Sequence, residues 1–339
     1  MGMTLRVGIS GYGLAGRYFH APLLKACGFE VVGVLTKNAE RRAQAQADFP
    51  HTAVVGSMRE LLFLGLDLLV VASATIAHAD QAIAGLQAGV PVVIDKPMGR
   101  TLEETEKIIA VSDETGVALT TYFNRLFDSD ALTVKKAIAE GALGDIFRLD
   151  SRFERFRPVS NPKSWRETRS GADGGGNLLD LGPHLVSLAL DWFGPAEVCY
   201  ASVRSIRGLA DDDIVINLKH ESGVDSYLSA SSIIGADGPR IRLSGSNGSL
   251  VIKELDPQEQ RLRDGEYPAG GVWTPPAMTP AFIYRGEEVR QYPAEAGNYS
   301  LFYSQVKAAI MSEGPWPVTK DEALAVAKIL DDVRVISIR

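Results

Sequence analysis

The fold is decided by the stretch Leu5-Arg6-Val7-Gly8-Ile9-Ser10-Gly11-Tyr12-Gly13-Leu14-Ala15-Gly16. Its first half is a short apolar run typical of a buried strand, and its second half is a G-x-G-x-x-G loop that leads into a predicted helix over residues 17–26. Gly11 would make the tight turn, Gly13 would let the backbone approach a pyrophosphate, and Gly16 would let helix and strand pack closely. All six loop residues, Gly11, Tyr12, Gly13, Leu14, Ala15 and Gly16, are therefore candidate contacts of a dinucleotide.

The first third of the chain alternates strands with helices. The predicted strands cover residues 30–35, 66–72, 90–94 and 117–122, and the predicted helices cover residues 39–48, 79–88 and 101–116. Capping boxes at Ser57-Met58-Arg59-Glu60 and Thr101-Leu102-Glu103-Glu104 indicate two helix starts. This alternation predicts an α/β domain of the Rossmann type over residues 1–124, with a doubly wound parallel sheet.

From residue 125 the pattern changes to longer segments in which apolar and polar residues alternate. These predict strands over residues 146–156, 198–206, 214–220, 224–234, 241–244 and 250–255. Helices are predicted over residues 131–140 and 299–311 and after the capping box at Thr319, whereas residues 265–280 predict an irregular segment. The second domain, residues 125–339, is therefore predicted to be α+β, with a large, mostly antiparallel sheet.

Composition excludes several classes of protein. The 339 residues, 45% of them hydrophobic, suffice for a large core and two domains. The net charge of −7 argues against a general nucleic-acid or membrane surface. Two cysteines are too few for a disulfide framework and lack the spacing of metal ligands. With no recognisable signal peptide, we expect a cytoplasmic protein without a metal site.

A lysine follows the predicted strand Val90–Ile94, in the sequence Asp95-Lys96-Pro97. Open α/β sheets bind ligands beyond the carboxyl ends of their strands, so these three residues are expected beside the cofactor. Ser73 and His78 follow the preceding strand and are expected near the cofactor as well. No cysteine–histidine cluster could hold a zinc ion, and a cation that steadies an alkoxide would therefore be Lys96.

The choice of cofactor is made at the end of the second strand, where NAD sites place an Asp or Glu. Here the residues are Thr36-Lys37-Asn38, and no carboxylate appears before Glu40. Lys37 with Arg41 or Arg42 could meet a 2′-phosphate, which favours NADP(H) over NAD(H) while leaving NAD(H) open. A plainer interpretation is that Asn38 caps the next helix and the basic side chains only face water. The two interpretations can hold together.

A third stretch whose side chains could take part in a reaction is Asp180-Leu181-Gly182-Pro183-His184. In a helix over residues 178–193, Asp180 and His184 would share one face, and the carboxylate would orient the imidazole and raise its pKa. Such a pair suits a proton acceptor in alcohol oxidation. Pro183 predicts a kink or a late helix start. The alternative is a histidine that is simply a satisfied, partly buried side chain.

These motifs, in this order, resemble the glucose–fructose oxidoreductase/inositol dehydrogenase (Gfo/Idh/MocA) family over nearly the whole chain. The family's E-K-P motif corresponds to Asp95-Lys96-Pro97, with Asp for Glu, and its G-G-G-x-x-x-D-x-G-x-H motif to residues 174–184. The resemblance implies that Lys96, Asp180 and His184 are the catalytic residues. It departs at the family's A-T-P-N-x-x-H stretch, which here is Ala72-Ser73-Ala74-Thr75-Ile76-Ala77-His78, so local cofactor contacts would differ there.

Within the family, the stretch from Phe153 to Pro158 and the Trp165-Arg166-Glu167 sequence look most like NADP-dependent scyllo-inositol dehydrogenases. Arg155, Trp165 and Arg166 would suit a polyhydroxylated ring, although strand packing and salt bridging explain them equally well. Asn124 is a further candidate for substrate binding.

The expected function is therefore oxidation or reduction at a secondary hydroxyl of a cyclitol or sugar, with NADP(H). A keto-sugar, aldose or diketone reductase and a non-catalytic NADP-sensing regulator are the alternatives. The resemblance also implies a homodimer or homotetramer built on the second-domain sheet, whose alternating strands have few helices between them to cover one face.

Overall fold

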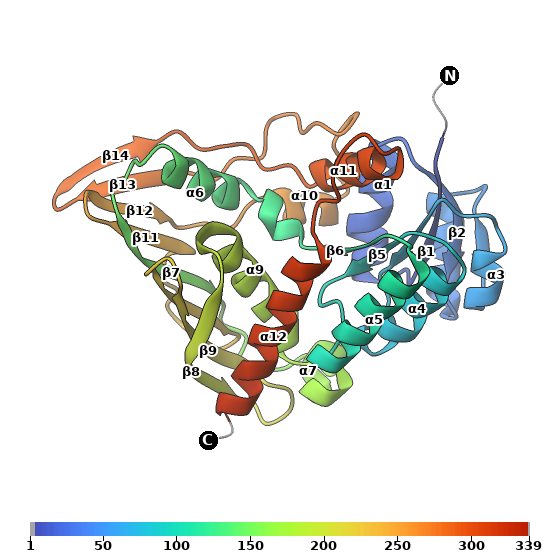
Figure 1. Ribbon diagram of the computed structural model, residues 1–339, viewed down its shortest axis with the longest axis horizontal. Helices are drawn as coiled ribbons and strands as arrows, with labels where there is room; N and C mark the ends of the chain where they lie inside the picture. The colour runs from blue at the N-terminus through green and yellow to red at the C-terminus, as the bar shows by residue number, and fades with distance from the viewer. Residues whose placement is uncertain (1–3, 338–339) are drawn as a thin grey trace.

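The computed structural model describes residues 4–337, which form two sheets with helices around and between them (Figure 1). The first sheet has six parallel strands and the second has eight, of which only β7 (Ile146–Glu154) and β10 (Asp225–Ser231) pair in parallel. The predicted fold class, a Rossmann-type domain followed by an α+β domain with a mostly antiparallel sheet, is confirmed.

The first sheet has the strand order β3-β2-β1-β4-β5-β6, in which the order reverses beside β1. Its strands are β1 Arg6–Ser10, β2 Glu30–Leu35, β3 Ala53–Val55, β4 Leu68–Val71, β5 Val92–Asp95 and β6 Leu119–Tyr122. The helices between them are η1 Ala15–His20, α1 Ala21–Ala26, α2 Ala39–Asp48, α3 Met58–Leu62, η2 Thr75–Ala77, α4 His78–Gln87 and α5 Leu102–Thr115. Because β4 and β5 are fully buried, their sequences are continuous apolar runs. Strand β3 was not predicted, since it has only three half-buried residues.

The second sheet has the strand order β14-β13-β12-β11-β7-β10-β9-β8. Its other strands are β8 Ala196–Arg204, β9 Asp213–His220, β11 Ile241–Gly245, β12 Gly248–Ile252, β13 Ala281–Arg285 and β14 Glu288–Tyr292. Sequence reasoning missed β13 and β14. In β14, four of the five residues are exposed, which leaves no apolar alternation. The irregular segment predicted over residues 265–280 contains no helix or strand.

Helices of the second half lie on one face of this sheet and between the two sheets (Figure 1). They are η3 Asn124–Phe127, α6 Ser129–Ala139, α7 Trp165–Thr168, η4 Gly171–Asp173, α8 Asn177–Asp180, α9 Gly182–Phe193, α10 Gln258–Arg263, α11 Ser300–Ile310 and α12 Lys320–Ser337. The six-residue α10 was not predicted. The capping boxes at Ser57 and Thr319 are both formed.

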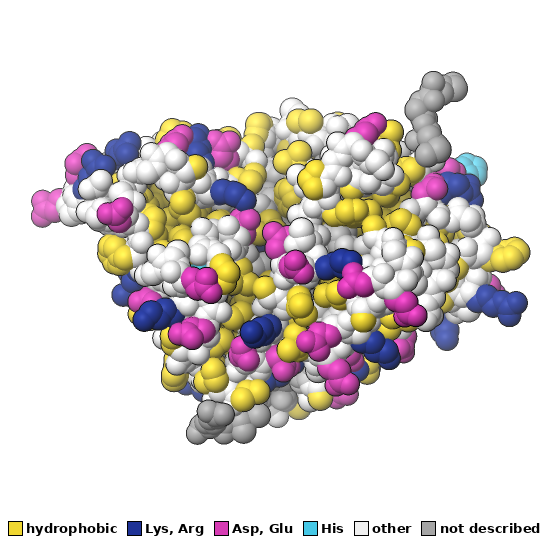
Figure 2. Space-filling model, viewed as in Figure 1, with side chains coloured by type: hydrophobic (Ala, Val, Ile, Leu, Met, Phe, Trp, Pro, Cys, Tyr) yellow, Lys and Arg dark blue, Asp and Glu magenta, His cyan; other side chains and the backbone are white. Residues whose placement is uncertain are grey.

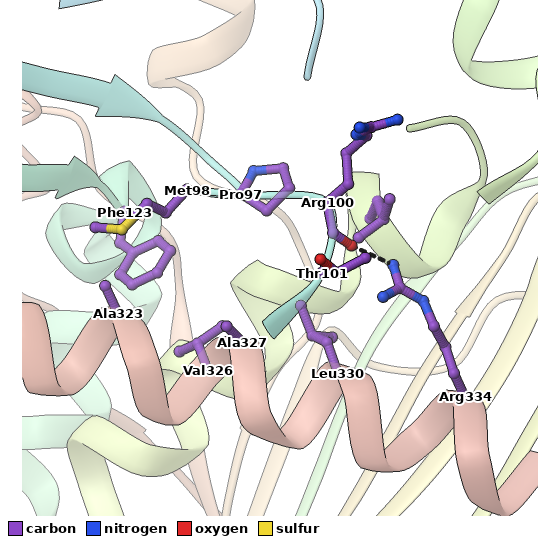
Figure 3. A pocket seen from close by; sticks show the side chains of 12 residues that line it. Pro97, Met98, Arg100, Thr101, Phe123, Ala323, Val326, Ala327, Leu330 and Arg334 are labelled. Carbon is purple, nitrogen blue, oxygen red and sulfur yellow. Dashed lines mark hydrogen bonds between the residues drawn. The ribbon is translucent and has the colours of Figure 1, made fainter. Parts of the chain in front are cut away.

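The C-terminal helix α12 packs against both halves of the molecule, touching α5 on one side and α9 and β8 on the other. Figure 3 shows it below the segment that follows Lys96, where Arg334 donates a hydrogen bond of 2.6 Å to the carbonyl of Arg100. The gap between them is about 10 Å³, room for one water molecule. The backbone after Lys96 is therefore supported from below by a helix some 230 residues later in the chain.

Acidic, basic and hydrophobic side chains are interspersed on the face shown in Figure 2. Among residues 4–337, no helix combines the length and the apolar character needed to cross a lipid bilayer. The same residues contain no group of three or more His, Cys, Asp or Glu side chains placed to hold a metal ion.

Candidate active site

A cleft of about 720 Å³ opens at the carboxyl ends of β1, β2 and β4. Both halves of the chain line it. The first half contributes Ser10, Gly11, Gly13, Leu14, Ala15, Leu35, Thr36, Lys37, Arg41, Gly56, Ser57, Met58, Ala72, Ser73, Ala74 and Gln81. The second half contributes Lys163, Ser164, Trp165 and Arg166, which belong to α7 and the residues before it. A crevice at the point where strand order reverses is where this sheet type binds dinucleotides.

The glycine loop forms the floor of this cleft. Gly11 has a φ of +97°, and a side chain at Gly16 would approach the carbonyl oxygen of Gly11 to 2.1 Å. At Gly13 a β-carbon would meet nothing closer than the Arg41 guanidinium at 3.6 Å, so this backbone is open to a ligand. The Tyr12 side chain is buried and donates to Asp48 at 2.9 Å, so only the backbone of Tyr12 is available to a cofactor.

The basic residues after β2 separate into two groups. Arg42 donates to the carbonyls of Thr36 and Val54 and is therefore committed to the fold. Lys37 and Arg41 are exposed on the cleft wall, and their charged groups have no hydrogen-bond or ion-pair partner among the described residues. Asn38 caps α2 by accepting from the Arg41 backbone at 3.0 Å. Asn38 therefore caps the helix while Lys37 and Arg41 stay unpaired among the described residues, so both interpretations of this stretch hold together.

Lys96 meets Asp180 where the two halves of the chain come together. The Lys96 ammonium donates to Asp180 Oδ1 at 2.9 Å and also to the Asp180 main-chain oxygen. Arg166 donates to the same Oδ1 at 3.1 Å and lies over the Trp165 ring, 4.6 Å from its centroid. Burial alone would raise the pKa of the Asp180 carboxyl, but Lys96 and Arg166 bring it well below its ordinary value. Asp180 is therefore ionised and fixes the lysine.

The late helix start that Pro183 predicts is found, whereas the predicted relation between Asp180 and His184 is wrong. The expected helix over residues 178–193 is broken at Leu181 into α8 and α9, with Pro183 in the first turn of α9, where its missing N–H costs nothing. Asp180 binds Lys96 and Arg166 instead of the imidazole. Burial, together with the positive charges of Lys96, Arg125 and Arg240, lowers the pKa of His184 well below its ordinary value, although Asp180 raises it.

His184 is only 7% exposed, and its ring lies 6.2 Å from that of Phe153. Its Nδ1 is buried and has no hydrogen-bond partner among residues 4–337, which leaves Nε2 as the atom that can meet a substrate hydroxyl. A neutral imidazole in this setting is able to accept a proton.

Three other predicted cofactor contacts are buried behind the cleft. Asp95 accepts from the Lys96 backbone at 3.0 Å and lies 3.8 Å from His20. His78 is 1% exposed and bridges the carbonyls of Pro97, at 2.9 Å, and Ser73, at 3.2 Å. Pro97 lines the small gap above α12 instead of the cleft. These three residues shape the strand ends, whereas Ser73, the fourth predicted contact of this region, does line the cleft.

The candidate substrate residues lie in different places. Asn124 is buried at the start of the turn after β6, and Trp165 and Arg166 line the cofactor cleft. Arg155 is half-buried and its guanidinium has no partner among the described side chains. Burial and the nearby Arg157 lower its pKa.

Sequence reasoning missed several residues of the site. Gln81 accepts hydrogen bonds from Ser10 and Ser73 at 2.8 Å each. The sequence feature that could have indicated it is its position on the helix after β4. Lys163 lies two residues before the Trp165-Arg166-Glu167 sequence. His20 has no local signal, because its partner Tyr303 lies 283 residues away. Arg240 stands beside His184 without any local motif.

Comparisons with known proteins agree over the whole chain. The model of an oxidoreductase family with an NAD-binding Rossmann fold matches residues 5–123, and the GFO/IDH/MocA C-terminal domain matches residues 131–251. The chain is 33% identical to scyllo-inositol 2-dehydrogenase (NADP(+)) IolW of Bacillus subtilis (strain 168), over 97% of this chain and 92% of that protein. It is 32% identical to the uncharacterized oxidoreductase YdgJ of Escherichia coli (strain K12), over 98% and 96%. The solved structure of the oxidoreductase yvaA from Bacillus subtilis superposes with a TM-score of 0.88 at 31% identity, covering 99% of this chain and 96% of that one.

Proposed function

Since the chain belongs to the Gfo/Idh/MocA family of oxidoreductases, we propose that it is an NADP(H)-dependent dehydrogenase for a secondary hydroxyl of a cyclitol or sugar. The predicted family and the predicted class of enzyme, a nicotinamide-dependent dehydrogenase acting on CH–OH groups, are confirmed. The observation that carries the proposal is the ion pair of Lys96 with Asp180 at the carboxyl end of the parallel sheet, with both charges acting on the buried imidazole of His184.

The uncommitted cations support the preference for NADP(H). Lys37 and Arg41 face the cleft at the end of β2, where an NAD site would place a carboxylate, and they have no protein partner among residues 4–337. A 2′-phosphate would give both cations a partner through charge-assisted hydrogen bonds. The relative IolW is named as an NADP(+) enzyme, which points the same way.

The proposed mechanism assigns one task to each catalytic side chain. Bound in the cleft, the nicotinamide supplies the hydride acceptor for oxidation or the donor for reduction. A lysine ammonium has three N–H donors, and Lys96 spends two on Asp180, which leaves one for the substrate oxygen. That fixed donor stabilises the developing alkoxide. His184 Nε2 takes the hydroxyl proton, and Asp180 acts by holding Lys96 in place.

We further propose that the enzyme self-associates through the second sheet. One face of that sheet is covered by helices that include α9 and α12. On the other face, Tyr200, Tyr227 and Val289 are 53%, 38% and 50% exposed, and the register aligns Tyr200 and Tyr227 across β9. Exposed aromatic and aliphatic side chains on a flat sheet favour association with a second copy. Light scattering at micromolar concentration should give the mass of a dimer or tetramer, and a monomer would contradict this proposal.

Turnover assays test the function directly. The enzyme is supplied with NADP+ and a panel of cyclitols and sugars, and with NADPH and the corresponding ketones. The proposal expects turnover of at least one secondary alcohol and its ketone, with higher kcat/KM for NADP(H) than for NAD(H). Reduction of aldoses or diketones alone would identify another reductase of the family. Tight NADP(H) binding without turnover of any panel member would contradict the proposal and favour a regulator.

A further inference from the structure

A buried cluster of charges lies within about 10 Å of His184 in the second half of the chain. Arg240 is 3% exposed and forms an ion pair of 3.4 Å with Asp130, whose side chain is fully buried. Arg240 also donates to Ser151 at 2.6 Å. Asp130 lies in the first turn of α6, where a carboxylate is favourable, but no motif at the start of β11 explains a buried arginine. Buried ion pairs contribute little to stability on balance, so another role has to be sought.

The ring of Phe153 connects this cluster to the active site. The Arg240 guanidinium carbon lies 3.9 Å from the centroid of the ring, and that of Arg125 lies 5.6 Å from it. The His184 ring centroid is 6.2 Å from the same centroid. The imidazole can therefore be no more than about 10 Å from the Arg240 charge, in a region shielded from water.

Arg125 is held by acidic partners of its own. It forms an ion pair of 3.1 Å with Asp128, binds Glu259 and donates to the Tyr299 hydroxyl at 3.2 Å. The charged groups that act on the imidazole are thus Lys96 from the end of β5, Arg125 from η3 and Arg240 from the start of β11. Asp180 from α8 opposes all three.

We propose that Arg240 is a positioning residue of the active site, which holds the Phe153 ring as the platform for His184 and keeps the imidazole neutral through its fixed positive charge. Arg125, which also contacts the Phe153 ring, helps to hold the ring and to keep the imidazole neutral. This inference rests on the proposed role of His184 as proton acceptor. An imidazole that is neutral in the ground state is able to accept a proton, whereas one already protonated cannot act as a base. The direction of the His184 pKa agrees with this arrangement.

The test follows the titration of His184 itself. Histidine NMR signals of the cofactor-free enzyme are titrated with acid, and the His184 signal among the five histidines is identified by its loss in the His184→Asn variant. The variants are Arg240→Gln, which removes the charge, and Arg240→Lys, which keeps it. Phe153→Leu removes the platform and keeps every charge. If Arg240→Gln fails to fold, Arg240→Met replaces it, because it also removes the charge and keeps the length of the side chain.

In the wild type, His184 should titrate below pH 6.5, its ordinary value. Removing one charge about 10 Å away, at an effective dielectric constant of about 20, should raise that midpoint by roughly one pH unit. Arg240→Lys should leave it within about a third of a unit, since the same relation gives no change for a retained charge. The acid limb of kcat/KM should move with the midpoint, and Phe153→Leu should lower kcat without moving it.

Two results would overturn the inference. One is an unchanged His184 midpoint in Arg240→Gln or Arg240→Met, and the other is an equal shift in Arg240→Lys. Because the NMR titration needs neither substrate nor cofactor, it remains decisive if no polyol is turned over. Failure of the proposed function and failure of this inference are therefore distinguishable.

Discussion

The two ends of the active-site region use positive charge in opposite ways. Around the glycine loop, Lys37, Arg41 and Lys163 are exposed on the cleft wall, and their charged groups have no partner within residues 4–337. At the reacting end, Lys96, Arg125 and Arg240 are largely buried and each is paired with an acidic side chain. The exposed cations are free to bind a ligand's phosphates. The paired cations are fixed, and they set the protonation and position of their neighbours.

This contrast predicts different consequences for substitution at each end. Loss of a fixed, paired cation should change the rate of the chemical step, because such groups act on the transition state. Loss of a free cation should change affinity and cofactor choice and leave the chemical step nearly intact. The predictions that follow test this difference.

The largest effect is expected at the reacting end. Lys96→Met removes the alkoxide-stabilising cation and should lower kcat by about 10²–10³-fold. His184→Asn removes the general base and should lower kcat by about 10²–10⁴-fold. Steady-state kinetics on the best polyol measures both, and fluorescence titration should show cofactor affinity changed far less.

Matched surface variants serve as controls for these two changes. Lys135, whose side chain is 60% exposed and paired with Asp191 at 2.9 Å, provides Lys135→Met, and the exposed His51 provides His51→Asn. Near-normal kcat in both Lys96→Met and His184→Asn would contradict the distinction between fixed and free cations and the proposed mechanism.

An intermediate effect is expected at the end of β2. Each charge-assisted hydrogen bond to a 2′-phosphate contributes about 1.5–3 kcal/mol, or roughly 10–150-fold in affinity. Lys37→Gln and Arg41→Gln should therefore each weaken NADPH binding within that range and leave NADH binding unchanged. Titration of each variant with NADPH and with NADH gives the ratio of the two affinities. Equal binding of NADPH and NADH by the wild type, or no change of ratio in either variant, would contradict the assignment.

The smallest effect is expected at Lys163, which reaches the cleft from the second half of the chain. It lines the same cleft as the glycine loop, and we expect it to contact the pyrophosphate, which NADPH and NADH share. Lys163→Gln should weaken both cofactors by the same factor, of order 10-fold or less for one exposed charge contact. The discriminating readout is the ratio of the two affinities, which should stay constant in Lys163→Gln. A selective loss of NADPH would place Lys163 at the 2′-phosphate instead, and Lys135→Gln controls for the loss of a surface charge.

The same two ends differ in how far they could be predicted from sequence. The glycine loop, β2 and α2 follow from local features, namely an apolar run, a glycine pattern and a capping asparagine within 45 residues. Those features act over short distances, so the predicted bounds of β2 and α2 agree with the structure.

The reacting end depends on contacts between distant parts of the chain. Lys96 binds Asp180 across 84 residues, and His20 meets Tyr303 across 283. The motifs indicated Lys96, Asp180 and His184 individually, but the pairing of Asp180 with Lys96 and not with His184 depends on the break at Leu181. Arg240 and Arg125 act through the Phe153 ring, and no local pattern places either beside His184.

The most direct test of the central claim is a crystal structure with NADP+ and a polyol that the enzyme oxidises. The account predicts one secondary hydroxyl whose oxygen lies within about 3 Å of both Lys96 Nζ and His184 Nε2, hydrogen-bond distance for each. Its carbon should face the nicotinamide, and Asp180 should remain bound to Lys96. A hydroxyl held away from both side chains, or Lys96 and His184 more than roughly 10 Å apart with cofactor bound, would place them beyond reach of one oxygen and contradict the account.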